Sequence, residues 1–301
     1  MRASDLPIVV GAGSPWQRLH IHTQLANTTE DIDRNVESAI RRGLPSFTGL
    51  VGTQRGAVSV VGSGPSLKEK WKELGWLQKK GVPIIACNAS FQFLLARGIT
   101  PEYFFCFDAD PLMLEFMTPV DGVTYLMASR CPPKAFDMIE GQDIYVWHTM
   151  GDENIVKILQ KYDDPSKPEE KVINGGSAAV VRCMVLAQTM GFSKLHIWGG
   201  DSSFRNEDTH IRKSTTEEKT MFVMVNKRAF ETAPWMTRQV EDFKLLAASL
   251  QAHQGCKIIV HGDSLLSHVA MTMGIETDAE PKYKQTFRNL KMKSQLFWQA
   301  L

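Results

Sequence analysis

One stretch of the chain joins an apolar run directly to a glycine-containing turn. Residues 57–61 are small or β-branched, as in a buried strand, and Gly62-Ser63-Gly64-Pro65-Ser66-Leu67 follows at once. Pro65 cannot donate to a strand ladder but suits the first turn of a helix. Glycine lets the backbone approach a ligand closely, and a helix N-terminus presents free N–H groups and the positive end of a dipole. The stretch therefore predicts a strand–turn–helix unit that binds phosphate at the turn.

This turn differs from two common phosphate-binding motifs. Gly62 and Gly64 are not followed by the third glycine of the dinucleotide fingerprint, and no Gly-Lys-Ser/Thr follows as in a Walker loop. A strand-to-helix turn with nothing bound is therefore the alternative interpretation, and the turn alone does not decide between the two.

Composition excludes several classes of protein. The 301 residues are 43% hydrophobic and 22% charged, which is typical of a soluble globular protein of one large or two small domains. A net charge of +1 does not predict a general nucleic-acid or membrane surface. The five cysteines include no Cys-x-x-Cys pair, so we expect reduced thiols, no zinc site and a cytoplasmic location. Neither a signal peptide nor a membrane span is expected.

Strand and helix patterns alternate along most of the chain. We expect strands at 57–61, 82–87, 103–107, 123–127, 144–147, 194–198 and 257–261, and helices at 66–80, 91–97, 178–190 and 242–253. This order predicts an α/β, Rossmann-like fold, with a mainly parallel sheet and helices on both faces.

Three segments are predicted on this basis. Residues 1–56 form an N-terminal helical lead-in, in which residues 28–31 supply N-cap chemistry and a helix from Asp31 to Arg42 stops near Gly43. Residues 57–270 form a Rossmann-like nucleotide-binding catalytic domain. Residues 271–301 form a basic helical tail, which we interpret as an exposed amphipathic segment, with contact to nucleic acid or another acidic polymer as the alternative.

Polar residues follow the predicted strands where each one ends. Ligands of open α/β sheets bind outside the carboxyl ends of the strands, so these residues are expected on one rim. Turns favour Asn, Asp and Gly in any case, so the whole set, more than any single residue, indicates a binding site. The set comprises Gly62, Ser63, Gly64, Asn88, Asp108, Asp110, Asp201, Asp263 and Ser264, with Gly175, Gly176 and Ser177 opening a later helix as a second potential anion site.

Several of these motifs recur in the same order in one superfamily. They are Val61-Gly62-Ser63-Gly64-Pro65-Ser66-Leu67, Gly98-Ile99-Thr100-Pro101-Glu102-Tyr103 leading to Asp108-Ala109-Asp110-Pro111, and Asn174-Gly175-Gly176-Ser177 leading to Gly199-Gly200-Asp201 and Thr209-His210. Over residues 30–270 the chain resembles the archaeal 6-hydroxymethylpterin pyrophosphokinase-like proteins, a grouping that includes the motility-associated-factor glycosyltransferases of flagellin. It is more distantly similar to the bacterial sialyltransferases that modify lipooligosaccharide.

The resemblance implies a nucleotide held over the strand ends. In the sialyltransferases, residues at five matching places hold a cytidine-monophosphate sugar. In this chain those places are occupied by Gly62, Gly64, Ser66, Asn88 and Ser177. Asp108 stands where those enzymes have a second Asn. Two tyrosines that hold the donor phosphate there have no counterpart, because Ser203 and Phe204 occupy the nearer region.

The resemblance also supplies a candidate base. His210 is the best match to the catalytic histidine of the sialyltransferases, and a neutral imidazole can take a proton from an acceptor hydroxyl. Asp201 or Asp208 is a candidate to orient it. His148, after the strand at 144–147, is the runner-up, and a surface histidine without a catalytic role is the alternative for His210.

Charged residues near these positions offer two further roles. Asp108 and Asp110 are two apart on an extended chain and therefore point the same way, which suits a shared magnesium ion, with Asp201 as a third ligand. Turn capping is the alternative for this pair. Arg205 and Arg212 are candidates for contact with a phosphate or an acidic acceptor, and a solvated loop is their alternative.

The leading hypothesis is a glycosyltransferase that uses a nucleotide-activated sugar and inverts its configuration on transfer to an acceptor hydroxyl. It requires no cofactor. The acceptor class stays open between glycan, protein, small molecule and modified nucleic acid. One alternative is a magnesium-dependent pyrophosphokinase that transfers diphosphate from ATP to a hydroxymethylpterin-like alcohol. Another is a non-catalytic nucleotide-binding module.

Overall fold

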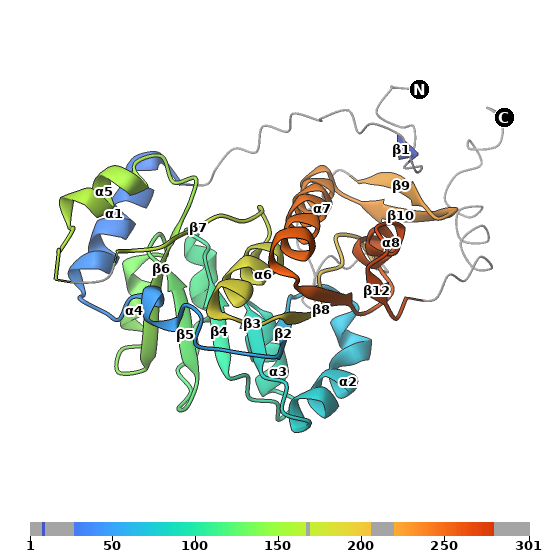
Figure 1. Cartoon of the computed structure of the whole chain (residues 1–301), viewed down its shortest axis with the longest axis horizontal. Coiled ribbons are helices and arrows are strands. Elements are labelled where there is room, and N and C mark those ends of the chain that lie inside the picture. Colours follow the sequence, from blue (N-terminus) through green and yellow to red (C-terminus); the bar gives the residue numbers. More distant parts are fainter. Residues whose placement is uncertain (1–7, 10–26, 167–168, 206–219, 280–301) are drawn as a thin grey trace.

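A nine-stranded, wholly parallel sheet forms the centre of the protein (Figure 1). The computed structural model describes residues 8–9, 27–166, 169–205 and 220–279. The strand order is β12-β11-β8-β2-β3-β4-β5-β6-β7, and each pairing along it is parallel. The strands are β2 (Ala57–Val61), β3 (Ile84–Cys87), β4 (Tyr103–Cys106), β5 (Thr124–Ala128), β6 (Asp143–Thr149), β7 (Val172–Ile173), β8 (Lys194–Trp198), β11 (Lys257–Val260) and β12 (Glu276–Thr277). The predicted fold class is confirmed.

The order of the strands reverses between β2 and β8. After β2 the chain proceeds through β3, β4, β5, β6 and β7 toward one edge, then returns to place β8 on the other side of β2. Val61 pairs with Trp198 at the carboxyl ends of the two strands, so the turns that begin at Gly62 and Gly199 leave the sheet side by side. Such a switch point is where open α/β sheets bind their ligands.

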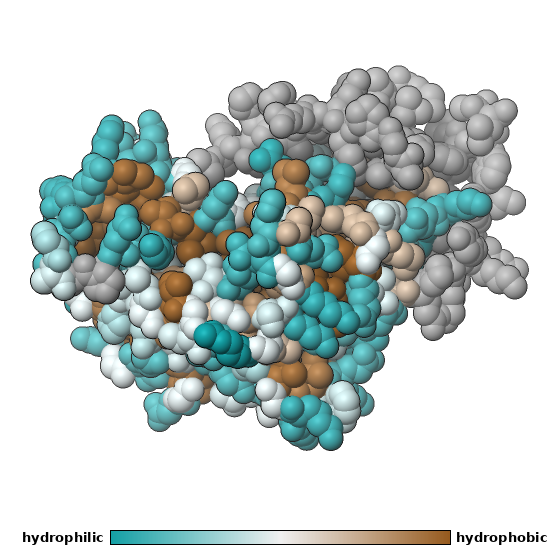
Figure 2. All heavy atoms as spheres, viewed as in Figure 1, coloured by the Kyte–Doolittle hydropathy of each residue, from teal (hydrophilic) through white to brown (hydrophobic). Residues whose placement is uncertain are grey.

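Helices cover the sheet on both faces, with α2 and α3 on one and α6 and α7 on the other (Figure 1). Their bounds are α2 (Leu67–Lys79), α3 (Ser90–Leu95), α6 (Ala179–Met190) and α7 (Pro234–Gln254). Because both faces are covered, the central strands read as continuous apolar runs and bury nearly every residue. The outer surface is different, since hydrophilic side chains cover much of the face shown in Figure 2 and apolar ones appear in separate patches.

The predicted N-terminal helix is α1 (Thr29–Arg41), and its start follows the predicted capping chemistry. Thr28 Oγ1 accepts from the N–H of Asp31 at 3.1 Å, and the Asp31 carboxylate accepts from the N–H of Thr28 at 3.2 Å. α1 packs on α5 (Ile155–Lys161) through a small apolar cluster separate from the main core. The division into lead-in, catalytic domain and tail stays a prediction, and residues 280–301 lie outside the described part.

The sequence prediction missed a second, three-stranded sheet formed by β1 (Ile8–Val9), β9 (Met221–Val225) and β10 (Arg228–Thr232). β9 and β10 form a hairpin whose two turn residues, Asn226 and Lys227, have φ values of +51° and +61°. Two left-handed residues in a two-residue loop match the twist of a hairpin, but lysine is a rare occupant of such a turn. Residues 206–219, between β8 and β9, lie outside the described residues.

Several helices also differ from prediction, and α5 was not predicted. α7 begins at Pro234, eight residues before the predicted start at 242, because Pro234 occupies the first turn. α8 (Leu265–Thr272) was not predicted, since its buried apolar residues give no amphipathic period. The remaining short elements are η2 (Phe47–Leu50), η3 (Pro111–Phe116) and α4 (Pro133–Asp137). All five cysteines are buried and free of disulfides. Among the described residues, no helix has the length and hydropathy needed to cross a bilayer.

Candidate functional site

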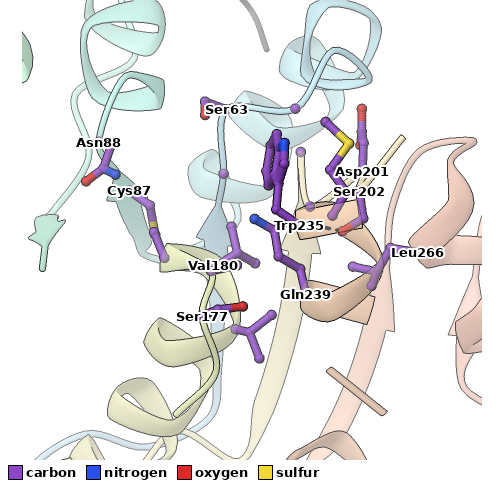
Figure 3. A pocket seen from close by; sticks show the side chains of 18 of the residues that line it. Ser63, Cys87, Asn88, Ser177, Val180, Asp201, Ser202, Trp235, Gln239 and Leu266 are labelled. Atoms are coloured by element: carbon purple, nitrogen blue, oxygen red, sulfur yellow. Dashed lines mark hydrogen bonds between the residues drawn. The ribbon is translucent and has the colours of Figure 1, made fainter. Parts of the chain in front are cut away.

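A cavity of about 230 Å³ lies at the carboxyl ends of the strands, at the switch point between β2 and β8 (Figure 3). It is bounded by the turns after β2, β3, β4 and β8, by the start of α6 and by the first turns of α7. Its lining residues are Gly62, Ser63, Gly64, Cys87, Asn88, Phe107, Asp108, Ser177, Ala178, Ala179, Val180, Val181, Gly199, Gly200, Asp201, Ser202, Trp235, Met236, Gln239 and Leu266.

The cavity brings together many of the predicted site residues from distant parts of the chain. Those that line it are Gly62, Ser63, Gly64, Asn88, Asp108, Ser177 and Asp201. Ser66, Gly175, Gly176, Asp110 and Arg205 do not line it. His210 and Arg212 lie outside the described residues, so their predicted roles stay predictions.

The N–H groups of the Gly62–Leu67 turn are mostly bonded within the protein. Gly62 donates to the carbonyl oxygen of Trp198 and Gly64 to that of Gly199, both at 2.7 Å, and Leu67 donates to Gly64. The N–H of Ser66 donates to the carboxylate of Asp201 at 2.6 Å. Within the described residues only the N–H of Ser63 has no acceptor in this turn. The free N–H groups expected from the sequence are therefore largely absent, and a phosphate here would use Ser63.

The glycines of this turn allow two backbone segments to approach each other. A Cβ atom built on Gly62 would lie 2.5 Å from the carbonyl oxygen of Gly199, and one built on Gly64 would lie 2.6 Å from the same oxygen. Gly199, with φ of +60°, would in turn place a Cβ 2.5 Å from the Gly62 oxygen. In the structure these glycines allow close approach between the turns after β2 and β8, and their close approach to a ligand stays a prediction.

Asp201 is the acidic partner of the α2 N-terminus. It is 5% exposed, and its carboxylate also accepts from the hydroxyl of Ser66 at 2.5 Å. Burial raises the pKa of Asp201 to about 6, against the opposing effect of the hydrogen bonds from Ser66. A carboxylate thus occupies the place where the sequence predicts a ligand anion. The predicted role of Asp201 in orienting a base stays a prediction.

Ser177, at the start of α6, has the same arrangement on the opposite side of the cavity. Its N–H and its hydroxyl both donate to Asp242 Oδ2, at 2.7 and 2.8 Å. Gly176 stands against Asp242, since a Cβ there would lie 2.6 Å from the Asp242 Cβ. Gly175 stands against the buried side chain of Arg182, whose guanidinium donates to the Gly175 carbonyl oxygen at 3.3 Å. At the second predicted anion site, too, the protein's own side chains form hydrogen bonds and contacts with the residues expected to bind an anion.

Asn88 has features of a ligand-binding residue. Its φ of +51° is rare for a residue with a side chain, and it follows β3 directly. Its Oδ1 is buried and has no hydrogen-bond partner among the described residues. In Figure 3 its amide nitrogen faces the cavity. Backbone strain and an unpartnered amide both suggest a role other than stability.

The remaining predicted acidic and basic residues have different partners, although the Asp108 carboxylate accepts from the N–H of Asp110 at 3.2 Å. Asp108 is exposed at the cavity rim, whereas Asp110 caps η3 by accepting from the N–H of Leu112 at 2.9 Å. Arg205 forms ion pairs with Glu69 on α2 and with Asp263. Within the described part of the chain, no three His, Cys, Asp or Glu side chains converge as a metal site requires. Asp108, Asp110 and Asp201 do not converge in this way, and their role as magnesium ligands stays a prediction.

Sequence reasoning missed the wall that α7 contributes. Trp235, Met236 and Gln239 line the cavity from the first turns of that helix, with Leu266 of α8 beside them. The predicted helix began at residue 242, past all three of these α7 residues. Pro234 was the available sign of an earlier start. His148, the runner-up base, is 2% exposed and lies away from the cavity lining, with Nδ1 2.9 Å from Ser129 Oγ.

Comparison with solved structures identifies similar folds. A chain of the MAf glycosyltransferase from Magnetospirillum magneticum AMB-1 is 16% identical, with a TM-score of 0.57 over 90% of this chain and 42% of that one. The present chain thus spans about two fifths of that protein's length, and the likeness shows the fold. A mammalian sialyltransferase is 11% identical, with a TM-score of 0.39 over 77% of this chain and 79% of that one. The comparison with curated proteins found no match.

A family model matches residues 27–207, a segment that includes β2 to β8 and the turns on one side of the cavity. Its description is "6-hydroxymethylpterin diphosphokinase MptE-like", which confirms the resemblance inferred from the order of the motifs. Since the matched segment is more than half of the chain, the protein belongs to the 6-hydroxymethylpterin diphosphokinase MptE-like family.

Proposed function

We propose that the protein is a glycosyltransferase whose nucleotide-activated sugar donor binds in the cavity at the β2–β8 switch point. The observation that carries this proposal is the convergence of Ser63, Asn88, Asp108 and Ser177 on one cavity from four separate segments. The fold shared with the MAf glycosyltransferase is consistent with it. A transferase of this kind also agrees with the sequence hypothesis.

The chemistry of the cavity lining supports a donor with little charge. Hydroxyl, amide and backbone groups line it together with two carboxylates and several apolar side chains, and neither lysine nor arginine is among its described lining residues. Sugar and ribose hydroxyls pair well with such groups, whereas the four charges of ATP need several cations. Asp108 at the rim suits the acceptance of hydrogen bonds from a ribose diol.

The reaction proposed is a direct displacement. The acceptor oxygen forms a bond to the anomeric carbon of the sugar while the bond from that carbon to the donor phosphate breaks, which inverts the configuration. The electron pair leaves on the phosphate, and the acceptor proton passes to a base, for which His210 is the candidate. The N–H of Ser63 and the amide of Asn88 are the proposed donors to the leaving phosphate and the nucleoside.

Direct binding measurements test the proposal. CMP, UMP, UDP, GDP and their sugar derivatives would be titrated into the full-length protein by calorimetry, with and without magnesium. At least one is expected to bind, and Asn88→Ala is expected to weaken it about tenfold, as loss of one or two hydrogen bonds implies. Asn226→Ala, in the distant β9–β10 turn, is the control. If no nucleotide or nucleotide sugar binds, the proposal is wrong.

A diphosphokinase is the second candidate, because the family model carries that description. In that reaction the alcohol oxygen of a pterin-like substrate attacks the β-phosphate of ATP, diphosphate is transferred and AMP leaves. Magnesium would neutralise the transferring group, with Asp108 the cavity carboxylate available to hold it. AMP release that depends on both magnesium and 6-hydroxymethylpterin would establish this activity and displace the leading proposal.

A further inference from the structure

The cavity has two walls of different origin. One wall, with Ser63, Asn88 and Ser177, lies inside the segment that the family model matches, 27–207. The other wall is formed by α7, which begins at Pro234 and lies entirely after that segment. The matched segment supplies most of the cavity lining, and the lining residues after it are Trp235, Met236 and Gln239 of α7 and Leu266 of α8.

Two side chains of α7 point from this second wall into the cavity. Trp235 and Gln239 are four residues apart, so they lie on the same face of the helix. Figure 3 shows the indole of Trp235 and the amide of Gln239 directed from α7 toward the wall that carries Ser63 and Asn88. Met236, between them in sequence, also contributes to the lining.

The amide of Gln239 is oriented by a neighbour. Its Oε1 accepts from the hydroxyl of Ser202 at 3.4 Å, which turns its nitrogen toward the cavity. Asn88 presents its amide nitrogen from the opposite wall while its Oδ1 is buried. Two neutral N–H donors thus face one space from both sides. Neutral donors match ring carbonyl and ring nitrogen acceptors, and these acceptors carry no charge that would call for lysine or arginine.

We propose that Trp235 and Gln239 bind a flat heterocyclic ring of the ligand, with the indole packed on the ring face and the amides of Gln239 and Asn88 donating to its acceptors. The inference rests on the proposed function, since it assigns the ring end of a nucleotide to this half of the cavity. A pterin ring offers the same chemistry: a planar face and carbonyl and ring nitrogen acceptors. The test therefore includes both sources.

The experiment compares ligands with and without a ring in the full-length protein. CMP, UMP, GMP, AMP, 6-hydroxymethylpterin and ribose 5-phosphate would be titrated by calorimetry. Base–aromatic stacking predicts that Trp235→Leu weakens the preferred ring-bearing probe about tenfold or more, and Gln239→Leu is expected to act in the same direction. Binding of ribose 5-phosphate is expected to stay unchanged in both variants. Preference for a nucleotide or for 6-hydroxymethylpterin identifies the source of the ring.

Matched variants separate recognition from folding. Trp76→Leu, at a tryptophan 60% exposed on α2, and Gln251→Leu, at an exposed position of α7, are expected to bind as the wild type does. Trp235→Phe keeps a ring and is expected to restore most of the affinity that Trp235→Leu loses, which also controls for a misfolded leucine variant.

Two results overturn the inference while leaving the proposed function intact. In the first, Trp235→Leu and Gln239→Leu bind every nucleotide as tightly as the wild type does, although Asn88→Ala has lost nucleotide binding. In the second, the α7 variants lose ribose 5-phosphate binding and nucleotide binding equally. That result would show that α7 contributes to binding of the sugar-phosphate part and not of the ring. Absence of any binding to the wild-type protein overturns the proposed function itself, and the inference with it.

Discussion

The carboxylate of Asp201 holds Ser66 by two hydrogen bonds, at 2.6 Å from the backbone N–H and at 2.5 Å from the hydroxyl. The two residues are 135 apart in sequence, and both are buried. The bond pair fastens the turn after β8 to the start of α2, directly beside the cavity. Ser177 and Asp242 repeat the pattern at the start of α6. The shape of the cavity therefore depends on two internal carboxylates.

Replacing Asp201 should destabilise the protein. Asp201→Ala leaves a buried N–H and a buried hydroxyl without an acceptor, which costs about 2–3 kcal/mol in the free energy of unfolding. Asp201→Asn should cost less, because its amide oxygen still accepts one bond. Urea unfolding at pH 7 measures both. Asp242→Ala is the comparison, since Ser177 is exposed and water replaces the lost acceptor. Equal losses for the two alanine variants would contradict this account.

Gly199 and Gly255 allow backbone strain to be separated from close approach. Both have φ of +60°, but a Cβ on Gly255 meets no atom within 4 Å, whereas one on Gly199 lies 2.5 Å from the Gly62 oxygen. Gly255→Ala should therefore cost about 1 kcal/mol of stability through strain alone. Gly199→Ala should cost several times more, because two backbone turns must separate. Thermal and urea unfolding of the two variants measure the loss in the free energy of unfolding. Similar losses would show that the two turns can move apart with little loss of stability.

The sequence alone predicted the parallel sheet well, for a physical reason. The central strands are buried on both faces, so they read as short apolar runs, and several of them are followed closely by a glycine, an amide or a carboxylate that marks the turn. The predicted strand at 57–61 coincides with β2 and that at 194–198 with β8. The positions that line the cavity were also predictable in part, because parallel strands place their carboxyl ends on one rim.

What these residues do there was less predictable. The type of residue at a strand end does not show whether its partner is a ligand or another part of the chain. The N–H of Ser66 was expected to be free, but Asp201 arrives from 135 residues away to accept from it. The α7 wall was missed because Trp235 and Gln239 precede the clear helical period. Such long-range pairings need coordinates.

Burial of His148 should make the protein sensitive to acid. Burial lowers the pKa of His148 from 6.5 to about 4. The unfolded chain then binds a proton between pH 6.5 and 4 that the folded protein does not, so the free energy of unfolding falls as the pH drops through this window. The shift corresponds to about 3 kcal/mol. His148→Gln should flatten the pH dependence of urea unfolding between pH 7 and 4.

Two comparisons sharpen this test. His196, whose pKa burial also lowers to about 4, keeps part of the acid sensitivity in the His148→Gln variant. His253→Gln, at an exposed position of α7, should leave the wild-type profile unchanged. A profile of His148→Gln that runs parallel to the wild-type profile down to pH 4 would refute the assignment.

Asp108 and Asp110 should have separable roles despite their proximity in sequence. Asp110 caps η3, so Asp110→Ala should lower the free energy of unfolding by about 1 kcal/mol and leave nucleotide affinity unchanged.

Asp108 lies exposed on the cavity rim, so Asp108→Asn should leave stability within about 0.5 kcal/mol of the wild type. Its effect should appear as weaker nucleotide binding, because an amide cannot replace both carboxylate oxygens as acceptors. Titration with and without magnesium then shows whether Asp108 contacts hydroxyls directly or through an ion. If Asp110→Ala weakened binding as much as Asp108→Asn, the paired role predicted from the sequence would be restored.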